Sequence, residues 1–310
     1  MSGFEFEPSS WIPFRDKEVL KRVRAIQREE IEQHPNPEFK IRVIPDSMME
    51  WIWVSDMFAR IREARQSGDR VTFILPNPAH TYKHLAHLIN RCQLSCDHLH
   101  VFIMDEYADE DGRVAPESWP LSFMYAFKTF FYKELEPALR PPEEQIHGPT
   151  TENIRDYGRR IADIGGADAC YSGPGWTGHL AFIEPDAPEF EGDLETWKGM
   201  SSRIVTLSPF TIAQNSLHGF FGMSGDLGAV PPRAATIGPA EVIGAQYRMD
   251  MNALTTDGTN VSWQRFICRL VSHGPVTPLV PTSILQTLPT DYYITETIAM
   301  NIEPFWDKAY

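Results

Sequence analysis

The sequence predicts an α/β fold, a three-layer Rossmann-like open sheet that is mostly parallel and carries helices on both faces. Apolar runs of strand length occur at residues 71–75, 100–104 and 169–171, and segments of helical periodicity lie between them. Strands that alternate with helices favour a parallel sheet, because the crossover between two parallel strands is usually a helix. A chain of 310 residues with 42% hydrophobic residues is long enough for one large domain with an ordinary core.

The first helix is expected over residues 16–33, where apolar side chains recur at helical spacing and prolines follow. A second helix over residues 47–66 ends at Gly68, before the strand at 71–75. The remaining elements are expected in this order: helix 80–91, strand 100–104, helices 118–135 and 152–163, strands 202–207 and 233–237, helix 259–272, and strand 291–295.

Two regions are expected along the chain. Residues 1–45 form an N-terminal extension with its helix, and residues 46–310 form a single α/β domain. The aromatic and proline-bearing residues 1–15 are expected to wrap onto the body or onto a neighbouring subunit. The first residues lack a basic stretch followed by an apolar one, and no apolar run approaches the about 18 residues of a membrane span, so neither export nor membrane insertion is expected.

Charge and cysteine content limit the partners and the compartment. A net charge of −14 disfavours nucleic acid and anionic membranes as partners, because both require a basic surface. Four cysteines in a chain of this length do not make a disulfide framework, which fits a reducing, cytoplasmic location. A metal site at Cys92, Cys96, His98 and His100 is an alternative, but the side chains of the strand at 100–104 alternate between its faces.

Two adjacent carboxylates, Asp105 and Glu106, end the apolar strand at 100–104 and precede Tyr107. Ligands of open α/β sheets bind outside the carboxyl ends of the strands, so an acid placed there is a candidate general base. The alternative is that Asp105 caps the following helix and Glu106 is solvated.

A second candidate motif, residues 172–185, follows the strand at 169–171. Gly175 and Gly178 permit a tight turn and a close approach of a ligand to the backbone, and His179 can move protons near neutral pH. Glu184 could orient the imidazole. The alternative is a glycine-rich turn that carries a structurally satisfied histidine.

Together these motifs resemble the glucosamine-6-phosphate deaminase/isomerase family, whose relatives include the 6-phosphogluconolactonases. The family's Met-Asp-Glu-Tyr is matched at 104–107, its Pro-Glu-Ser-aromatic at 116–119, and its glycine-histidine motif at 173–185 with differences. Residues 230–238 resemble its Val-Pro-x-x-Ala-Leu-Thr-Val-Gly, and residues 283–286 its Ser-x-Leu-Gln. The resemblance covers residues 45–300.

The resemblance implies aldose–ketose chemistry on a small-molecule sugar or amino sugar. Asp105 would abstract the proton at C2 of the opened sugar, His179 would assist ring opening, and Glu184 would belong to the proton network of the histidine. Glu106 completes the catalytic group. No metal and no cofactor are implied, and the family resemblance predicts a homo-oligomer.

The chain departs from the family pattern at the residues that bind the substrate phosphate and at one acidic residue. Thr177 replaces the family's Asp before Gly-His, which removes one negative charge from the ring-opening network. The loop from Pro76 through Asn77 and Pro78 has no glycine, and prolines supply no N–H to a phosphate. Pro232 replaces a family lysine, and Leu217 or His218 replaces another basic residue.

These departures predict a non-phosphorylated sugar derivative, held by its hydroxyls and through a carboxylate paired with Arg233. The expected substrate contacts are Asn77, Tyr107, Gly175, Trp176, Thr177, Gly178 and Arg233. Trp176 is either a platform for a sugar ring or a plug in the vacated phosphate pocket. Residues 182–197 are either a mobile acidic lid or a solvated loop.

Two other functions stay open at this point. In a lactonase-type hydrolase, His179 would activate water against a sugar lactone while Asp105 only positions the substrate. In a non-catalytic sugar-binding protein, neither group would turn substrate over. The complete Met-Asp-Glu-Tyr favours the deaminase/isomerase, because a simple binder has no need for a carbon-acid base beside an imidazole.

Overall fold

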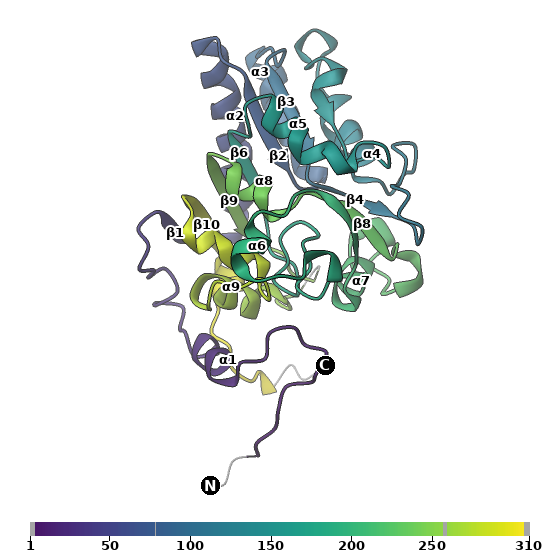
Figure 1. Cartoon of the computed structure of the whole chain (residues 1–310). Helices are drawn as coiled ribbons and strands as arrows, with labels where there is room; N and C mark the ends of the chain where they lie inside the picture. Colours follow the sequence, from purple (N-terminus) through teal and green to yellow (C-terminus); the bar gives the residue numbers. More distant parts are fainter. Residues whose placement is uncertain (1–3, 78, 257–258, 307–310) are drawn as a thin grey trace.

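A seven-stranded parallel sheet in the strand order β1-β10-β9-β6-β2-β3-β5 forms the core of the protein (Figure 1). The computed structural model describes residues 4–77, 79–256 and 259–306. Every pairing within this sheet is parallel, which confirms the predicted fold class. Its strands are β1 (Phe39–Ile44), β2 (Val71–Leu75), β3 (Leu99–Ile103), β5 (Ile146–His147), β6 (Ala169–Ser172), β9 (Tyr247–Asn252) and β10 (Thr290–Thr295).

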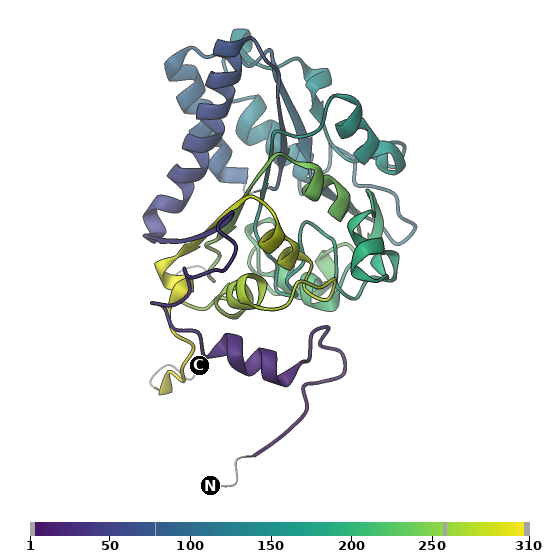
Figure 2. The same cartoon turned by 60° about the vertical axis from the view of Figure 1, so that its left-hand side comes forward.

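Helices cover both faces of this sheet. Helices α2 (Met49–Ser67) and α3 (Tyr82–Cys92) lie on one face, and α5 (Tyr157–Asp163) and α8 (Pro239–Gly244) lie on the other (Figures 1 and 2). Because β2 is covered on both sides, all of its residues are buried, as its unbroken apolar sequence requires. The other helices are α1 (Lys17–Arg24), α4 (Phe123–Phe127), α6 (Leu194–Lys198), α7 (Pro209–Ser216), α9 (Gln264–His273) and α10 (Glu296–Ala299).

A small antiparallel sheet continues from the carboxyl end of β3. It consists of β4 (Asp105–Ala108), β8 (Arg233–Thr236) and β7 (Arg203–Thr206), in that order. Met104 is the link between the two sheets, since its N–H donates to Leu75 O at 2.9 Å and its carbonyl accepts from Ile237 N at 2.9 Å. The chain therefore changes sheets immediately before Asp105.

The first predicted helix is shorter than its apolar periodicity indicates. Helix α1 ends at Arg24, and residues 25–33 form turns. Arg28 N donates to Asn301 Oδ1 at 2.8 Å, and Ile26 O accepts from Arg269 Nε at 3.0 Å. Tertiary hydrogen bonds to the C-terminal part of the chain thus replace the helical ones, and the prediction to residue 33 was wrong.

The predicted helix at 118–135 also begins later, at Phe123. The Ser122 hydroxyl caps it by accepting from Tyr125 N at 3.1 Å, which starts the helix at that point. Its helical path continues as a π-helical turn, Lys128–Tyr132. The buried Phe127 and Phe131 of this segment pack in the hydrophobic core, as expected for these aromatic residues.

Four strands escaped the sequence analysis: β1, β4, β5 and β9. Residues of β1 alternate between buried and exposed at first, as in an edge strand, and β1 pairs with β10 along its whole length. The division at residue 45 leaves this strand outside the domain. We propose that the α/β domain begins at residue 39.

The cysteines are free; Cys92 is exposed, while Cys96, Cys170 and Cys268 are buried. Cys96 Sγ donates to the nearby Leu94 carbonyl at 3.7 Å, and the alternative metal site at Cys92, Cys96, His98 and His100 does not assemble among the described residues. Within residues 4–77, 79–256 and 259–306, no helix is long and apolar enough to cross a membrane.

Replacing Arg269 with Leu tests how the N-terminal extension is held. Its fully buried guanidinium donates to the carbonyls of Ile26, Arg265, Ala299 and Met300, so the variant leaves buried acceptors without donors. We expect a loss of about 1–3 kcal/mol or more in the free energy of unfolding, measured by urea denaturation. Replacement of Arg62, which is exposed on α2, is the control and should change it by less than about 0.5 kcal/mol. Equal stability of the two variants would contradict this account.

Candidate functional site

The candidate site lies at the carboxyl edge of the parallel sheet, where β2, β3 and β6 end side by side. Leu75 is in register with Ile103, and Ile74 with Cys170. The segments that follow these strands carry Asn77, Asp105 and the turn that leads to His179. The fold therefore brings together three parts of the chain that the sequence analysis had selected separately.

Asp105 is the first residue after the switch between sheets, and it is 7% exposed. Among the described residues, no hydrogen-bond donor reaches its carboxylate. Burial raises the pKa of this carboxyl well above its usual range, and the neighbouring Glu106 adds to the rise. A buried carboxylate without a protein partner is destabilised as an anion, which makes it a stronger base toward a bound ligand.

Glu106 points to the opposite face of β4 and holds a helix start. Its carboxylate accepts from Ser122 Oγ at 2.8 Å, from Met124 N at 3.1 Å and from Tyr107 N at 3.0 Å. Burial raises its pKa, while the donors at the start of α4 oppose this rise. Glu106 is thus fully occupied at the N-terminus of α4, and its predicted place in the catalytic group stays a prediction.

The imidazole of His179 is fixed through Nδ1 by three side-chain oxygens. These are Thr211 Oγ1 at 2.9 Å, Thr177 Oγ1 at 3.1 Å and Glu184 Oε2 at 3.3 Å. The Thr177 hydroxyl also donates to Glu184 Oε2 at 3.1 Å, so it bridges the histidine and the acid. His179 and Glu184 are both buried.

This network determines the tautomer that we assign to His179. Because the Glu184 carboxylate, 3.3 Å from Nδ1, can only accept a hydrogen bond, we assign the ring proton to Nδ1. Nε2 is then left unprotonated and able to accept a proton. Thr177 thus fills the position of the family acid in the hydrogen-bond network, but it brings no charge.

The glycine turn places the ring of His179 against the backbone. A Cβ on Gly175 would lie 1.9 Å from His179 Nε2, so no side chain fits at this position. Gly178 has a φ of +77°, a left-handed conformation that favours glycine. Its carbonyl accepts from Thr282 N and Thr282 Oγ1, both at 2.9 Å, which ties the turn to the segment after α9.

Thr236 joins the two halves of the site. It is the strand partner of Asp105, and its hydroxyl accepts from Phe182 N at 3.1 Å. The ring of Phe182 lies 6.1 Å from the His179 ring and 5.8 Å from the Tyr107 ring. Tyr107 itself is buried, and its hydroxyl donates to Asn215 Oδ1 at 2.9 Å, so this predicted substrate contact already has a protein partner.

Helix α7 contributes site residues that the sequence analysis missed. Besides Thr211, it supplies Gln214, whose Oε1 accepts from Trp176 N at 2.7 Å, and Asn215. His218 lies two residues beyond the end of the helix. These polar residues are three or four positions apart, so they share one helix face, and this buried polar stripe was a signal that could have been read from the sequence.

His218, rather than the exposed Leu217, faces the site. Burial lowers the pKa of His218 to about 4, and the proximity of His179 contributes. Its Nε2 is buried without a hydrogen-bond partner among the described residues. At neutral pH this side chain is therefore an uncharged imidazole and not a cation.

Trp176 is 41% exposed and stacks on Trp263 with ring centroids 6.0 Å apart. It is therefore not a buried plug. The Trp263 ring also lies 6.1 Å from the His218 ring, and its buried Nε1 lacks a partner among the described residues. The two indoles form an aromatic wall next to the glycine turn.

Two further predicted substrate contacts, Asn77 and Arg233, have different surroundings. Both amide atoms of Asn77 are buried and have no hydrogen-bond partner within the described ranges, so their bonding capacity is unused. Arg233, at the start of β8, pairs with Glu189 Oε1 at 3.2 Å. The adjacent Pro78 lies outside the described residues.

Asp250 is a further buried acid that the sequence analysis did not select. It accepts from Ser172 Oγ at 2.6 Å and from Asn252 Nδ2 at 3.2 Å, directly beneath the glycine turn. Burial raises its pKa to about 7.

The predicted acidic loop at 182–197 contains helix α6 and buries Phe190 and Trp197, so hydrophobic contacts anchor it to the body.

Comparison with known proteins identifies the relatives of this chain. No family model matches it. A glucosamine-6-phosphate deaminase of Halothermothrix orenii is 30% identical over 214 residues, which cover 68% of this chain and 78% of the relative. The chain belongs to the glucosamine-6-phosphate deaminase family. The Caenorhabditis elegans glucosamine-6-phosphate deaminase is 34% identical over 200 residues, 61% of this chain and 66% of that enzyme.

Solved structures agree on the fold of this glucosamine-6-phosphate deaminase family member. A monomeric glucosamine-6-phosphate deaminase superposes with a TM-score of 0.69 at 18% identity, and covers 84% of this chain and 99% of its own. A 6-phosphogluconolactonase from Leishmania guyanensis gives 0.60 at 12% identity, with 86% and 99% covered. The protein is thus an enzyme of the glucosamine-6-phosphate deaminase/isomerase type, on a fold that is shared with lactonases.

Gly175→Ala tests the contact between the turn and the imidazole. The added methyl group must displace the His179 ring, and we expect a stability loss of about 1–3 kcal/mol together with a shifted His179 imidazole signal in NMR spectra. Gly244→Ala is the matched control, because nothing lies within 4 Å of its added Cβ. Unchanged His179 signals in Gly175→Ala would refute the close approach.

Asp105→Asn tests how much the ionised, buried carboxylate of Asp105 destabilises the fold. Because folding raises the pKa of Asp105, its contribution to stability is complete below the unfolded pKa of about 3.9 and is lost as pH rises through the folded value. The Asn variant should therefore gain stability relative to the wild type as the pH rises from 4 to 8. Thermal unfolding from pH 4 to 8 measures this, with exposed Asp69→Asn as control. A difference that is independent of pH would contradict the shifted pKa.

Proposed function

We propose that this protein opens the ring of a sugar or amino sugar and moves the proton at C2, through an enediol or enolamine, with Asp105 as the base. The observation that carries the proposal is the buried Asp105 carboxylate, which has no hydrogen bond to the described residues and lies at the edge of the sheet where His179 also lies. Abstraction of a proton from carbon needs a strong carboxylate base, and burial supplies it. With an amino sugar, protonation of C1 of the enolamine gives a ketimine, whose hydrolysis releases ammonia.

In this proposal His179 transfers protons between sugar oxygens during ring opening. Nε2 of the assigned tautomer accepts the proton of the hydroxyl at C1, and the resulting imidazolium returns a proton to the ring oxygen. Glu184 stabilises the positive charge through Nδ1, at 3.3 Å. Thr177 and Thr211 keep the ring oriented but cannot offset its charge.

We further propose that the substrate is not phosphorylated. Three features support this choice: the turn after β2 offers proline where a phosphate cradle needs N–H groups, His218 is uncharged at neutral pH, and Arg233 is paired with Glu189. The Asn77 amide and the Trp176–Trp263 wall suit a polar sugar ring better than a dianion. Arg233 would engage a substrate carboxylate only by exchanging it for Glu189.

The lactonase-type alternative has less support at the residue level. Hydrolysis of a lactone needs a base for water, which His179 could provide, but it does not need a second base, so the buried Asp105 carboxylate would only position the substrate. The structural likeness to lactonases concerns the fold. The alternative of a non-catalytic binder is disfavoured by membership of an enzyme family.

Proton exchange in deuterated buffer tests the proposed chemistry. The protein is incubated with phosphorylated and non-phosphorylated amino sugars, keto sugars and sugar lactones, and NMR follows deuterium at C2 together with ammonia release. We expect exchange with a non-phosphorylated sugar, and a loss of at least about 100-fold in Asp105→Asn, because that variant removes the base. Asp69→Asn, an exposed acid on the same protein, should retain the full rate.

Each other outcome changes a different part of the proposal. Exchange that persists in Asp105→Asn would remove Asp105 from its role. Lactone opening without exchange at C2 would favour the hydrolase. A preference for phosphorylated sugars would overturn the substrate class and leave the proton chemistry in place.

A further inference from the structure

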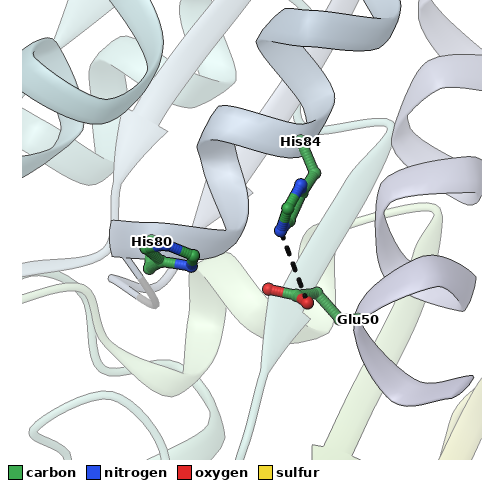
Figure 3. A group of neighbouring side chains, drawn as sticks. All are labelled: Glu50, His80 and His84. Carbon is green, nitrogen blue, oxygen red and sulfur yellow. Dashed lines mark ion pairs between the residues drawn. The ribbon is translucent and has the colours of Figure 1, made fainter. Parts of the chain in front are cut away.

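Glu50, His80 and His84 form a cluster of metal-ligating side chains that the proposed reaction does not use (Figure 3). One ligand atom from each lies within 4.8 Å of the other two. Glu50 Oε2 and His84 Nε2 are 3.6 Å apart. In the part of the chain that the structure describes, no other group of at least three such residues converges in this way.

The fold fixes the relative position of these side chains. His80 lies in the 3-10 turn Ala79–Thr81 and His84 in the first turn of α3, so the two rings stand one helical turn apart on the same side. Their centroids are 5.6 Å apart. Glu50 comes from the first turn of α2, the helix that packs alongside α3. A ligand bound to all three would join two helices.

Neighbouring groups orient two of the three. Thr81 Oγ1 donates to Glu50 Oε1 at 2.8 Å, which leaves Oε2 directed at His84. The Trp51 ring packs 5.1 Å from the His84 ring and restricts its rotation. Such partners around the ligating groups are typical of built metal sites, where they hold the ligands in place.

We propose that Glu50, His80 and His84 bind a late first-row divalent cation of the Zn²⁺ type. Two imidazoles and one carboxylate are a ligand set that Zn²⁺ accepts, with water in the fourth position, whereas Mg²⁺ and Ca²⁺ prefer oxygen ligands. Ligand atoms at about 2.1 Å from tetrahedral Zn²⁺ are about 3.4 Å apart, close to the 3.6 Å between Glu50 and His84. The exposed His80 needs to close by at most about 1.4 Å from the 4.8 Å limit, through side-chain rotation.

The site is separate from the proposed proton transfer, and it concerns the turn that follows β2. His80 immediately follows Ala79 of this turn, which stands where the resembling family carries its phosphate loop. A bound cation would fasten the turn to the first turn of α2. The ion is therefore expected to stabilise the fold. If no ion binds, Glu50 and His84 form only an ordinary histidine–glutamate pair.

Calorimetric titration of the metal-free, EDTA-treated protein with ZnCl2 tests the proposal, with MgCl2 as a second titrant. We expect one Zn²⁺ per chain, no comparable binding of Mg²⁺, and a rise in Tm with Zn²⁺. The single variants His80→Ala and His84→Ala should each weaken binding by more than about 100-fold, beyond the roughly 10–100-fold cost of losing an orienting partner. Circular dichroism verifies that each variant is folded.

Two control variants on the same helix separate this site from other zinc ligands. His87 and Cys92 are both exposed on α3 and outside the cluster, so His87→Ala and Cys92→Ser should bind Zn²⁺ like the wild type. Folded His80→Ala and His84→Ala variants that bind with wild-type affinity would overturn the assignment. So would the absence of stoichiometric binding to the wild type, or loss of binding in Cys92→Ser.

Discussion

The confinement of the His179 imidazole is the constraint on which the geometry of the site depends. On one side, Gly175 lies so close to the ring that an added Cβ would meet Nε2; on the other, Thr177, Thr211 and Glu184 surround Nδ1. These groups come from the turn after β6, from α7 and from the segment that follows the turn. Packing three segments around one ring fixes its position, and a small shift of any of them would move the imidazole within the site.

Side chains alternate between the two faces of a β-strand, so the two acids of the Met-Asp-Glu-Tyr motif have different surroundings. Because successive side chains point to opposite faces, Asp105 meets no donor among the described residues, while Glu106 accepts three hydrogen bonds, two of them from the start of α4. Burial raises the pKa of both, but only the pKa of Glu106 is opposed by donors. Two neighbouring acids on one strand thus differ in their hydrogen bonding, and this difference supports different roles for them.

The sequence predicted the parallel sheet and the convergence of the two motifs, because apolar runs, glycines and charged residues follow local rules. It failed where distant contacts decide the structure. Residues 25–33 leave the helical path to meet Arg269 and Asn301, and β1 depends on its pairing with β10. The cap formed by Glu106 and the contribution of α7 also required knowledge of which helices approach the sheet edge. The cluster at Glu50 was invisible for the same reason, since α2 and α3 meet only in the fold.

The replacements in this chain are consistent with one another electrostatically. A site for a phosphate needs cations or backbone N–H groups. Here the family acid is Thr177, one family cation is a neutral His218 and another is Pro232, while Arg233 is paired with Glu189. The loss of one acid and two cations therefore removes charge of both signs from the neighbourhood of the proton-transfer groups, which supports the proposal of a substrate without a phosphate.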